Sequence, residues 1–140
     1  MTSKREQILS ALVTMLSGAT TAGVNVFRSR VTAVTRDLTP AIIIRPEEDV
    51  PEKQFSGMVI SHLTVAIDVY TRGDVPDQLA DPVIVAAHAL IMGNPTINGL
   101  AALTVQAPSK WEMHEADQTA GLSTFLYHIR YTNQVFDLTQ

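Results

Sequence analysis

Apolar residues recur at helical spacing near the start of the chain and predict a first helix. From Lys4 to Ser17 they fall on one stripe of a 3.6-residue repeat, as in an amphipathic helix with one buried side. Ser3 followed by Glu6 forms a capping box, in which each side chain satisfies a backbone N–H of the first turn. Gly18 is suited to end this helix because glycine adopts a positive φ without steric cost.

A second helix is expected from Pro76 to Met92, where apolar residues again follow the helical repeat. Pro82 lies inside this range and lacks the backbone donor that a helix interior needs. Either Asp81 therefore caps a helix that starts there, or a longer helix kinks at the proline. Gly93 and the Asn94–Pro95 pair are expected to stop the helix.

Five segments have the residue types of β-strands. The clearest is Met58–Tyr70, where apolar and polar residues alternate over about twice the usual strand length, so that it should bend or project past its sheet. Pro40–Pro46 is apolar without alternation, which indicates a strand covered on both faces. The other expected strands are Val24–Arg28, Leu103–Met113, which Pro108 could break, and Gly121–Thr132.

The segments between the strands are rich in polar, proline and glycine residues and are predicted to be loops. Ser29–Thr39 is expected to be a loop or an irregular edge, Glu47–Gly57 a long acidic connection, and Glu115–Ala120 a polar turn. Residues Asn133–Gln140 are expected to form a C-terminal tail that either frays or adds contacts through its apolar side chains.

This element order, α-β-β-β-α-β-β, predicts an α+β fold. Runs of strands joined by short turns favour antiparallel pairing. We therefore expect a single, mostly antiparallel or mixed sheet of about five strands, packed against two helices on one face. The length of 140 residues fits one domain, residues 1–140.

Composition narrows the classes of function. The chain has no cysteine, which excludes disulfides and thiolate metal sites. Its formal net charge of −4 argues against nucleic-acid binding, and no apolar run is long enough to suggest a membrane partner. Only 17% of the residues are charged, which favours a surface partly covered by other proteins. No signal-peptide pattern is recognisable, so synthesis in the cytoplasm is expected.

The sequence contains no recognisable catalytic, cofactor or metal motif. Phosphate-binding glycine loops, dinucleotide fingerprints, zinc-protease motifs and nucleophile elbows are absent. His62 and His128 lie on two expected strands that could bring them together, as metal ligands or in a small hydrolase or isomerase, but no third ligand is in register. His88 is expected on a helix face. His114 lies in a polar stretch that ends at Asp117, where a solvated turn is favoured over an ion site.

Two oppositely charged segments are candidate contact surfaces. Arg28, Arg30 and Arg36 are too few for a nucleic-acid footprint but can meet acidic residues of a neighbouring copy. Trp111, the single tryptophan, is expected in the core, with an interface anchor as the alternative. The acidic side of the contact, with an aromatic residue beside it, is expected at Glu47, Glu48, Asp49, Glu52 and Phe55.

The order and texture of several short segments resemble the tail terminator proteins of long-tailed phages and prophages, the minor tail protein U type. The resemblance covers nearly the whole chain, although no single segment is specific. The segments that carry it are Arg5–Leu12, Val26–Arg30, Thr39–Ile44, Asp68–Tyr70, Gly73–Asp77, Trp111–Glu112, Glu115–Asp117, Ala120–Leu122 and Ile129–Tyr131.

The resemblance implies a structural role without a catalytic site or a cofactor. Such proteins form a ring, typically of six copies, on the end of a tail tube. The ring stops tube polymerisation and presents a surface to the head–tail connector, so the expected partners are further copies, the tube protein and the connector. The expected location is the tail end of the virion. A head–tail joining or head-completion protein, a ligand-binding module and a small enzyme are the alternatives.

Overall fold

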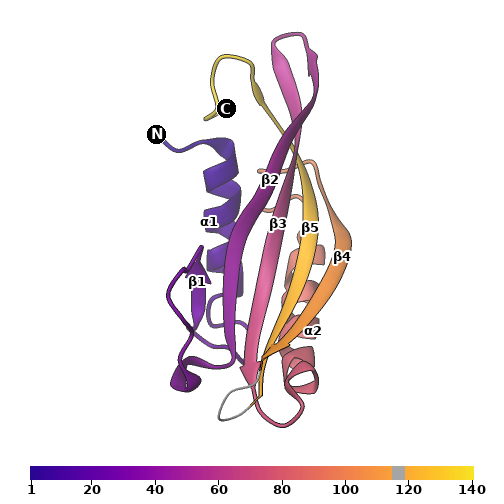
Figure 1. Ribbon diagram of the computed structural model, residues 1–140. Helices are drawn as coiled ribbons and strands as arrows, with labels where there is room; N and C mark the ends of the chain where they lie inside the picture. The colour runs from indigo at the N-terminus through magenta and orange to yellow at the C-terminus, as the bar shows by residue number, and fades with distance from the viewer. Residues whose placement is uncertain (115–118) are drawn as a thin grey trace.

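Over residues 1–114 and 119–140, which the computed structural model describes, five strands form one mixed sheet and two α-helices cover one of its faces (Figure 1). The strand order is β1-β2-β3-β5-β4, with β1 parallel to β2 and the other neighbours antiparallel, so the predicted α+β fold is confirmed. The elements are α1 Lys4–Leu16, β1 Val26–Arg28, the 3-10 helix η1 Arg36–Leu38, β2 Ala41–Phe55, β3 Met58–Arg72, α2 Pro76–Met92, β4 Leu103–His114 and β5 Ala120–Gln134.

The start of α1 follows half of the predicted capping box. The Ser3 hydroxyl accepts a hydrogen bond from the Glu6 backbone N–H at 3.2 Å. The Glu6 carboxylate does not return the bond to Ser3; it accepts from the Ser10 hydroxyl and the Arg28 guanidinium. Gly18 has the expected positive φ of 72° just after the helix.

The second helix, α2, runs from Pro76 through Pro82 without interruption, so the alternative in which Asp81 caps a helix that starts there is wrong. It begins at Pro76, after Val75. The missing donor of Pro82 would have bonded the Gln78 carbonyl; because Gln78 and Pro82 are both exposed, water can bond that carbonyl instead. No helix among the described residues has the length and apolar character needed to cross a membrane.

The prediction of a long acidic connection at Glu47–Gly57 is wrong, because most of this segment is the second half of β2. Only Ser56 and Gly57 form the turn, both with positive φ, as in the tight turns that join antiparallel strands. Two register shifts, at Pro46/Glu48 and Pro51/Lys53, interrupt the pairing with β3. Such bulges accommodate prolines that cannot donate to the ladder, which is how a proline-containing polar segment remains a strand.

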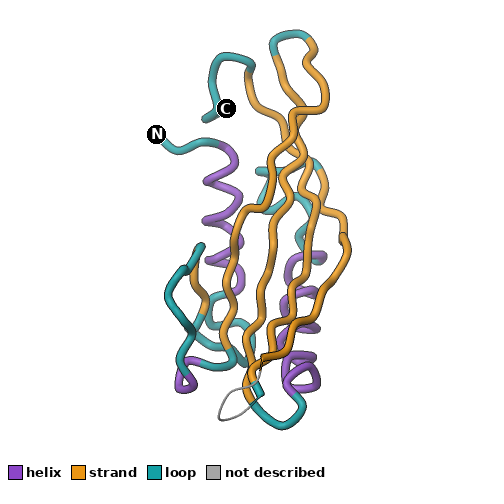
Figure 2. Tube along the Cα trace, viewed as in Figure 1, coloured by secondary structure: helices purple, strands orange, loops and turns teal. Residues whose placement is uncertain are grey.

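The far end of this hairpin, residues 50–62, projects beyond both helices, and we call it the hairpin arm (Figure 2). β3 has 15 residues, which confirms the expectation of an overlong strand, but it pairs with β5 over its whole length and so does not project past its sheet. Residues 51–57 are all exposed, whereas the β3 side of the arm, Met58–His62, pairs with the end of β5 up to the tip.

The main core lies between the helices and the sheet, built from alternate residues of β2, β3 and β5. On the opposite face, which we call the open face, a small second cluster of Val34, Ala41 and Ile43 lies under the loop that follows β1. Residues 41–44 are therefore buried on both faces, as the continuous apolar pattern predicted. The largest fully buried side chains are Ile8, Leu9, Leu12, Leu16, Ile42, Ile44, Leu63, Ile91, Ile97, Ile129, Val65 and Val69.

The last residues fold back towards the start of α1, and the two ends of the chain lie near each other (Figure 1). Residues 133 and 134 belong to β5. The Leu138 carbonyl accepts from the Lys4 backbone N–H at 2.6 Å, and the Thr139 carbonyl accepts from the Gln7 side chain at 3.3 Å. Phe136 remains 86% exposed in this segment, so the turn back leaves an apolar side chain on the surface.

Candidate assembly surfaces

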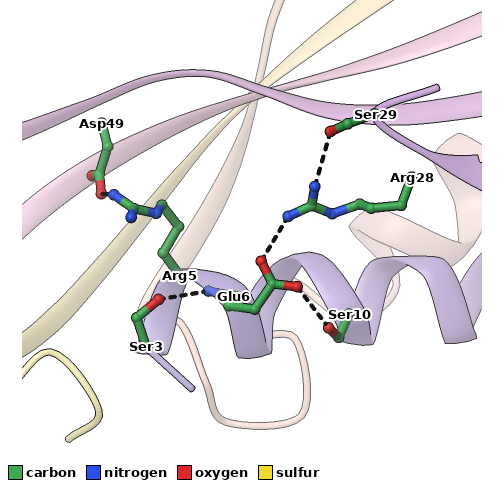
Figure 3. A network of polar contacts seen from close by, with 7 residues as sticks. All are labelled: Ser3, Arg5, Glu6, Ser10, Arg28, Ser29 and Asp49. Carbon is green, nitrogen blue, oxygen red and sulfur yellow. Dashed lines mark hydrogen bonds and ion pairs between the residues drawn. The ribbon is translucent and has the colours of Figure 1, made fainter. Parts of the chain in front are cut away.

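The first arginine of the predicted basic segment, Arg28, is held inside the chain. Its Nη2 donates to the Glu6 carboxylate at 2.8 Å and its Nη1 donates to the Ser29 hydroxyl at 2.9 Å (Figure 3). Glu6 also accepts from Ser10 at 3.2 Å. The pair joins the end of β1 to α1, so the charge of Arg28 is neutralised within the molecule.

The next arginine, Arg30, shapes the loop after β1. Its guanidinium carbon lies 4.5 Å from the centroid of the Phe27 ring, a cation–π contact. The same side chain donates to the carbonyls of Thr32 and Ala33, at 3.2 and 3.4 Å. Between these anchors Val31 is 99% exposed, so the loop presents an apolar side chain to solvent.

Arg36, in η1, leaves its charge free in solvent. The residue is exposed, and among the described residues no acidic group lies within ion-pair distance of its guanidinium. The neighbouring Asp37 is an anion, because hydrogen bonds from the Thr35 side chain and the backbone lower the pKa of its carboxyl. The loop therefore carries two outward cations, Arg30 and Arg36, against one anion.

On the acidic side, Glu47 is neutralised by a neighbour and Glu48 is exposed. Glu47 accepts a hydrogen bond from Arg45. Arg45 also donates to Asp68 at 2.6 Å, and that hydrogen bond raises the pKa of the guanidinium. Because Asp68 is only 4% exposed and also accepts from Thr124 at 2.7 Å, this network holds β2, β3 and β5 together on the open face.

Asp49 ties the base of the hairpin arm to the body. Its Oδ2 accepts from Arg5 at 3.1 Å (Figure 3) and from the Tyr131 hydroxyl at 2.6 Å. Burial raises the pKa of the Tyr131 phenol, and the hydrogen bond to Asp49 raises it further, so the hydroxyl stays a donor at every working pH. The other carboxylate oxygen, Oδ1, is buried without a hydrogen-bond partner among the described residues.

On the open face, the Glu52 side chain links β2 to the two next strands, β3 and β5. Its Oε2 lies 2.6 Å from His62 Nε2 and 3.9 Å from Arg130 Nη2. The hydrogen bond with His62 is the largest cause that lowers the pKa of the Glu52 carboxyl. Both side chains are substantially exposed, so this pair aligns the arm but adds little to stability.

The structure brings some of the predicted contact residues together and separates others. Arg28 lines one shallow groove with the acidic part of β2, so the two predicted patches partly adjoin within one chain. Arg30 and Arg36 lie in the loop at the β1 edge, away from this groove, and Phe55 is 44% exposed near the tip of the arm. Their role as an interface stays a prediction. The groove is lined by Arg5, Glu6, Leu9, Arg28, Pro46, Glu47, Glu48, Asp49 and Leu63.

His62 and His128 do lie on adjacent strands of the open face, in a shallow depression, but each bonds another residue. His62 pairs with Glu52, and His128 Nδ1 lies 3.0 Å from the Thr64 hydroxyl. Within the part of the chain that the structure describes, no group of three His, Asp or Glu side chains is placed to hold a metal ion.

The other two histidines, His88 and His114, say less about function. His88 on α2 bonds the Tyr127 hydroxyl at 2.8 Å, which makes it a packing residue between α2 and β5. The sequence hypothesis of an ion site between His114 and Asp117 falls on side chains outside the described residues.

One candidate surface, where α2 meets β4, was not predicted from the sequence. Trp111 is 57% exposed and packs edge-on against Phe125, with ring centroids 6.2 Å apart, so the core expectation is wrong. β4 is an edge strand, a fact that only the pairing order supplies. The four-residue spacing of Asp77 and Asp81 was a signal in the sequence, because it places both carboxylates on one side of a helix. A shallow depression here is lined by Asp77, Gln78, Asp81, Pro82 and Trp111.

These features define a class of protein: a two-layer α+β domain with exposed charged and apolar residues at sheet edges and on a projecting hairpin. No protein-family model matches the chain, and no curated protein is significantly similar to it.

Proposed function

We propose that this chain is a phage tail terminator, a structural subunit that forms a ring on the end of the tail tube. The ring stops tube polymerisation and provides the surface to which the head attaches. The proposal starts from the resemblance to the minor tail protein U type. Its partners are further copies, six in all by that resemblance, together with the tube protein and the head–tail connector.

The observation that carries the proposal is the hairpin arm. Its β2 side, residues 51–57, is exposed, and Phe55 and Val50 leave 44% and 43% of their surface in solvent. A long hairpin with exposed apolar side chains is a liability unless a partner covers it. A tube end is such a partner, because a ring of arms can contact the ring of tube subunits beneath it.

The role does not require a catalytic group or a cofactor. The charged side chains of the arm and its base bond one another, as Glu52 does with His62 and Asp49 with Tyr131 and Arg5. Such pairs fix the geometry of a contact surface. The protein acts in the virion at the tail end, after synthesis in the host cytoplasm.

The proposal is tested with tubes assembled from the tube protein of the same phage. Purified chain added during polymerisation is expected to give shorter tubes, with a ring at one end in electron micrographs. The variant Phe55→Ser is expected to retain ring formation but to cap fewer tubes, because it removes an exposed apolar contact at the tip of the arm.

Phe136→Ser is the control, since it makes the same substitution at an even more exposed phenylalanine outside residues 50–62. Tubes that grow to the same length with and without the chain, and that carry no ring at either end, contradict the proposal. Binding to isolated heads but not to tubes favours the alternative of a head–tail joining protein.

A further inference from the structure

A closed ring needs two different patches on each copy, placed on opposite sides, so that one patch meets the other on the next copy. The loop after β1, residues 30–36, is one such patch, and we call it the basic loop. It follows β1, the strand at one edge of the sheet, and reaches onto the open face, where the Val34 carbonyl accepts from Arg72 of β3 at 3.3 Å. Its outward groups are the free guanidinium of Arg36, the anchored Arg30 and the fully exposed Val31.

The complementary acidic patch has to carry carboxylates that are free of partners in the chain itself. The acidic half of β2 meets this condition poorly, since Glu47, Asp49 and Glu52 each lie within ion-pair distance of an arginine of the same chain. Asp77 and Asp81 on α2 meet it well. Among the described residues neither has an ion-pair partner, and α2 contains no lysine or arginine.

The shape of the α2–β4 surface also suits the basic loop. Asp77 and Asp81 flank the shallow depression whose apolar walls are Pro82 and Trp111, and we call it the acidic depression. Trp111 leaves 57% of its surface exposed there, and tryptophan is the residue most enriched at interface anchors. The basic loop combines an exposed apolar side chain, Val31, with the arginines Arg30 and Arg36, and this combination suits a depression with apolar walls and two carboxylates.

The positions of the two patches agree with ring closure. β1 and β4 are the two edges of the sheet, and the acidic depression combines residues of α2 with Trp111 of β4. The basic loop and α2 lie on opposite sides of the molecule at the end away from the hairpin arm (Figure 1). Contacts between them on successive copies would leave all the arms on one side of the ring.

We infer that the basic loop of one copy docks into the acidic depression of the next copy. Val31 then packs against Trp111 and Pro82, and Arg36 lies near Asp81. The inference rests on the proposed ring and names its subunit interface, which runs from the β1 edge to the α2–β4 edge.

Charge reversal with rescue in trans tests this interface. In Arg36→Glu a carboxylate of the loop faces Asp81, and in Asp81→Arg a guanidinium of the depression faces Arg36, so each variant places like charges opposite each other. Each variant alone is expected to assemble at least about ten-fold more weakly than wild type at low salt, measured by sedimentation velocity. An equal mixture is expected to restore assembly, because every contact in an alternating ring again joins opposite charges.

The double variant Arg36→Glu/Asp81→Arg restores the same pairing within one chain and is expected to assemble like wild type whatever the number of copies. Lys53→Glu and Glu48→Arg are matched controls, since they change the charge by the same amounts on the arm and on the acidic half of β2. Circular dichroism of each variant checks that it folds.

The outcomes separate this inference from the proposed function. If wild type assembles and the single reversals assemble equally well, or if neither the mixture nor the double variant restores assembly, the interface is wrong and the ring stands. If Glu48→Arg weakens assembly while Asp81→Arg does not, the acidic side lies on β2. If wild type remains monomeric at all concentrations and on tubes, both the ring and the interface are wrong.

Discussion

Replacing Tyr131 by Phe removes one hydroxyl at the base of the hairpin arm and leaves the aromatic side chain in place. Tyr131 is 5% exposed, so phenylalanine fills the same space without a cavity. The hydroxyl donates to Asp49 at 2.6 Å. After the substitution, Asp49 retains only the half-exposed Arg5 as a charged partner.

The expected cost follows from what Asp49 loses. A hydrogen bond to a charged group contributes about 1.5–3 kcal/mol, and an unpaired buried acceptor costs a similar amount. The Asp49 side chain is 19% exposed, so water can replace part of the lost bond. We therefore expect Tyr131→Phe to lower the free energy of unfolding by about 2 kcal/mol, or roughly 6 °C in melting temperature for a domain of this size.

Urea denaturation followed by circular dichroism measures this difference. Tyr127→Phe is the matched control, because Tyr127 is equally buried but bonds the imidazole of His88 and not a carboxylate, and it should cost only about 1 kcal/mol. Arg5→Gln breaks the exposed side of the same network and should cost less than about 1 kcal/mol. If Tyr131→Phe destabilises no more than Tyr127→Phe does, the bond to Asp49 does not anchor the arm.

Two further predictions concern pH and packing. Burial raises the pKa of Tyr127 from 10.0 to about 12 and raises that of Tyr131 as well, so the folded chain keeps phenolic protons that the unfolded chain releases. Stability should be complete below pH 10 and should fall as the pH rises towards 12, which urea midpoints and tyrosinate absorbance would follow together. Gly121→Ala would place a Cβ 2.5 Å from the Cβ of Pro76 at the start of α2 and should cost about 1–3 kcal/mol, measured by thermal unfolding. Gly99→Ala, which meets no atom within 4 Å but has a φ of 82°, should cost less; the reverse order would show that β5 and α2 are not tightly packed there.

The amphipathic and alternating patterns predicted most of the elements because burial on one side leaves a periodic trace in the sequence. α1 ends one residue before its expected end, α2 has its expected bounds, and β3 runs two residues beyond the predicted strand. The second half of β2 was missed for the same physical reason. Its side chains lie in solvent on an arm, so pairing with β3 holds it as a strand while no burial pattern marks it.

The residues of the candidate surfaces were predicted less well, because a charge in the sequence does not reveal its partner. Arg28 and Arg36 look alike in the chain, yet Glu6 neutralises one and the other lies free in solvent. Glu52 and Asp81 differ in the same way, since only Glu52 has His62 beside it.

The sequence alone therefore determined the element order, the α+β class and which face of each regular element is buried. The tertiary structure decided which strand lies at an edge, which exposes Trp111, and which charges remain unpaired at the two sides of the molecule. The physical reason is that periodicity is a local property of the chain, whereas strand order and ion pairing depend on contacts between residues far apart in the sequence.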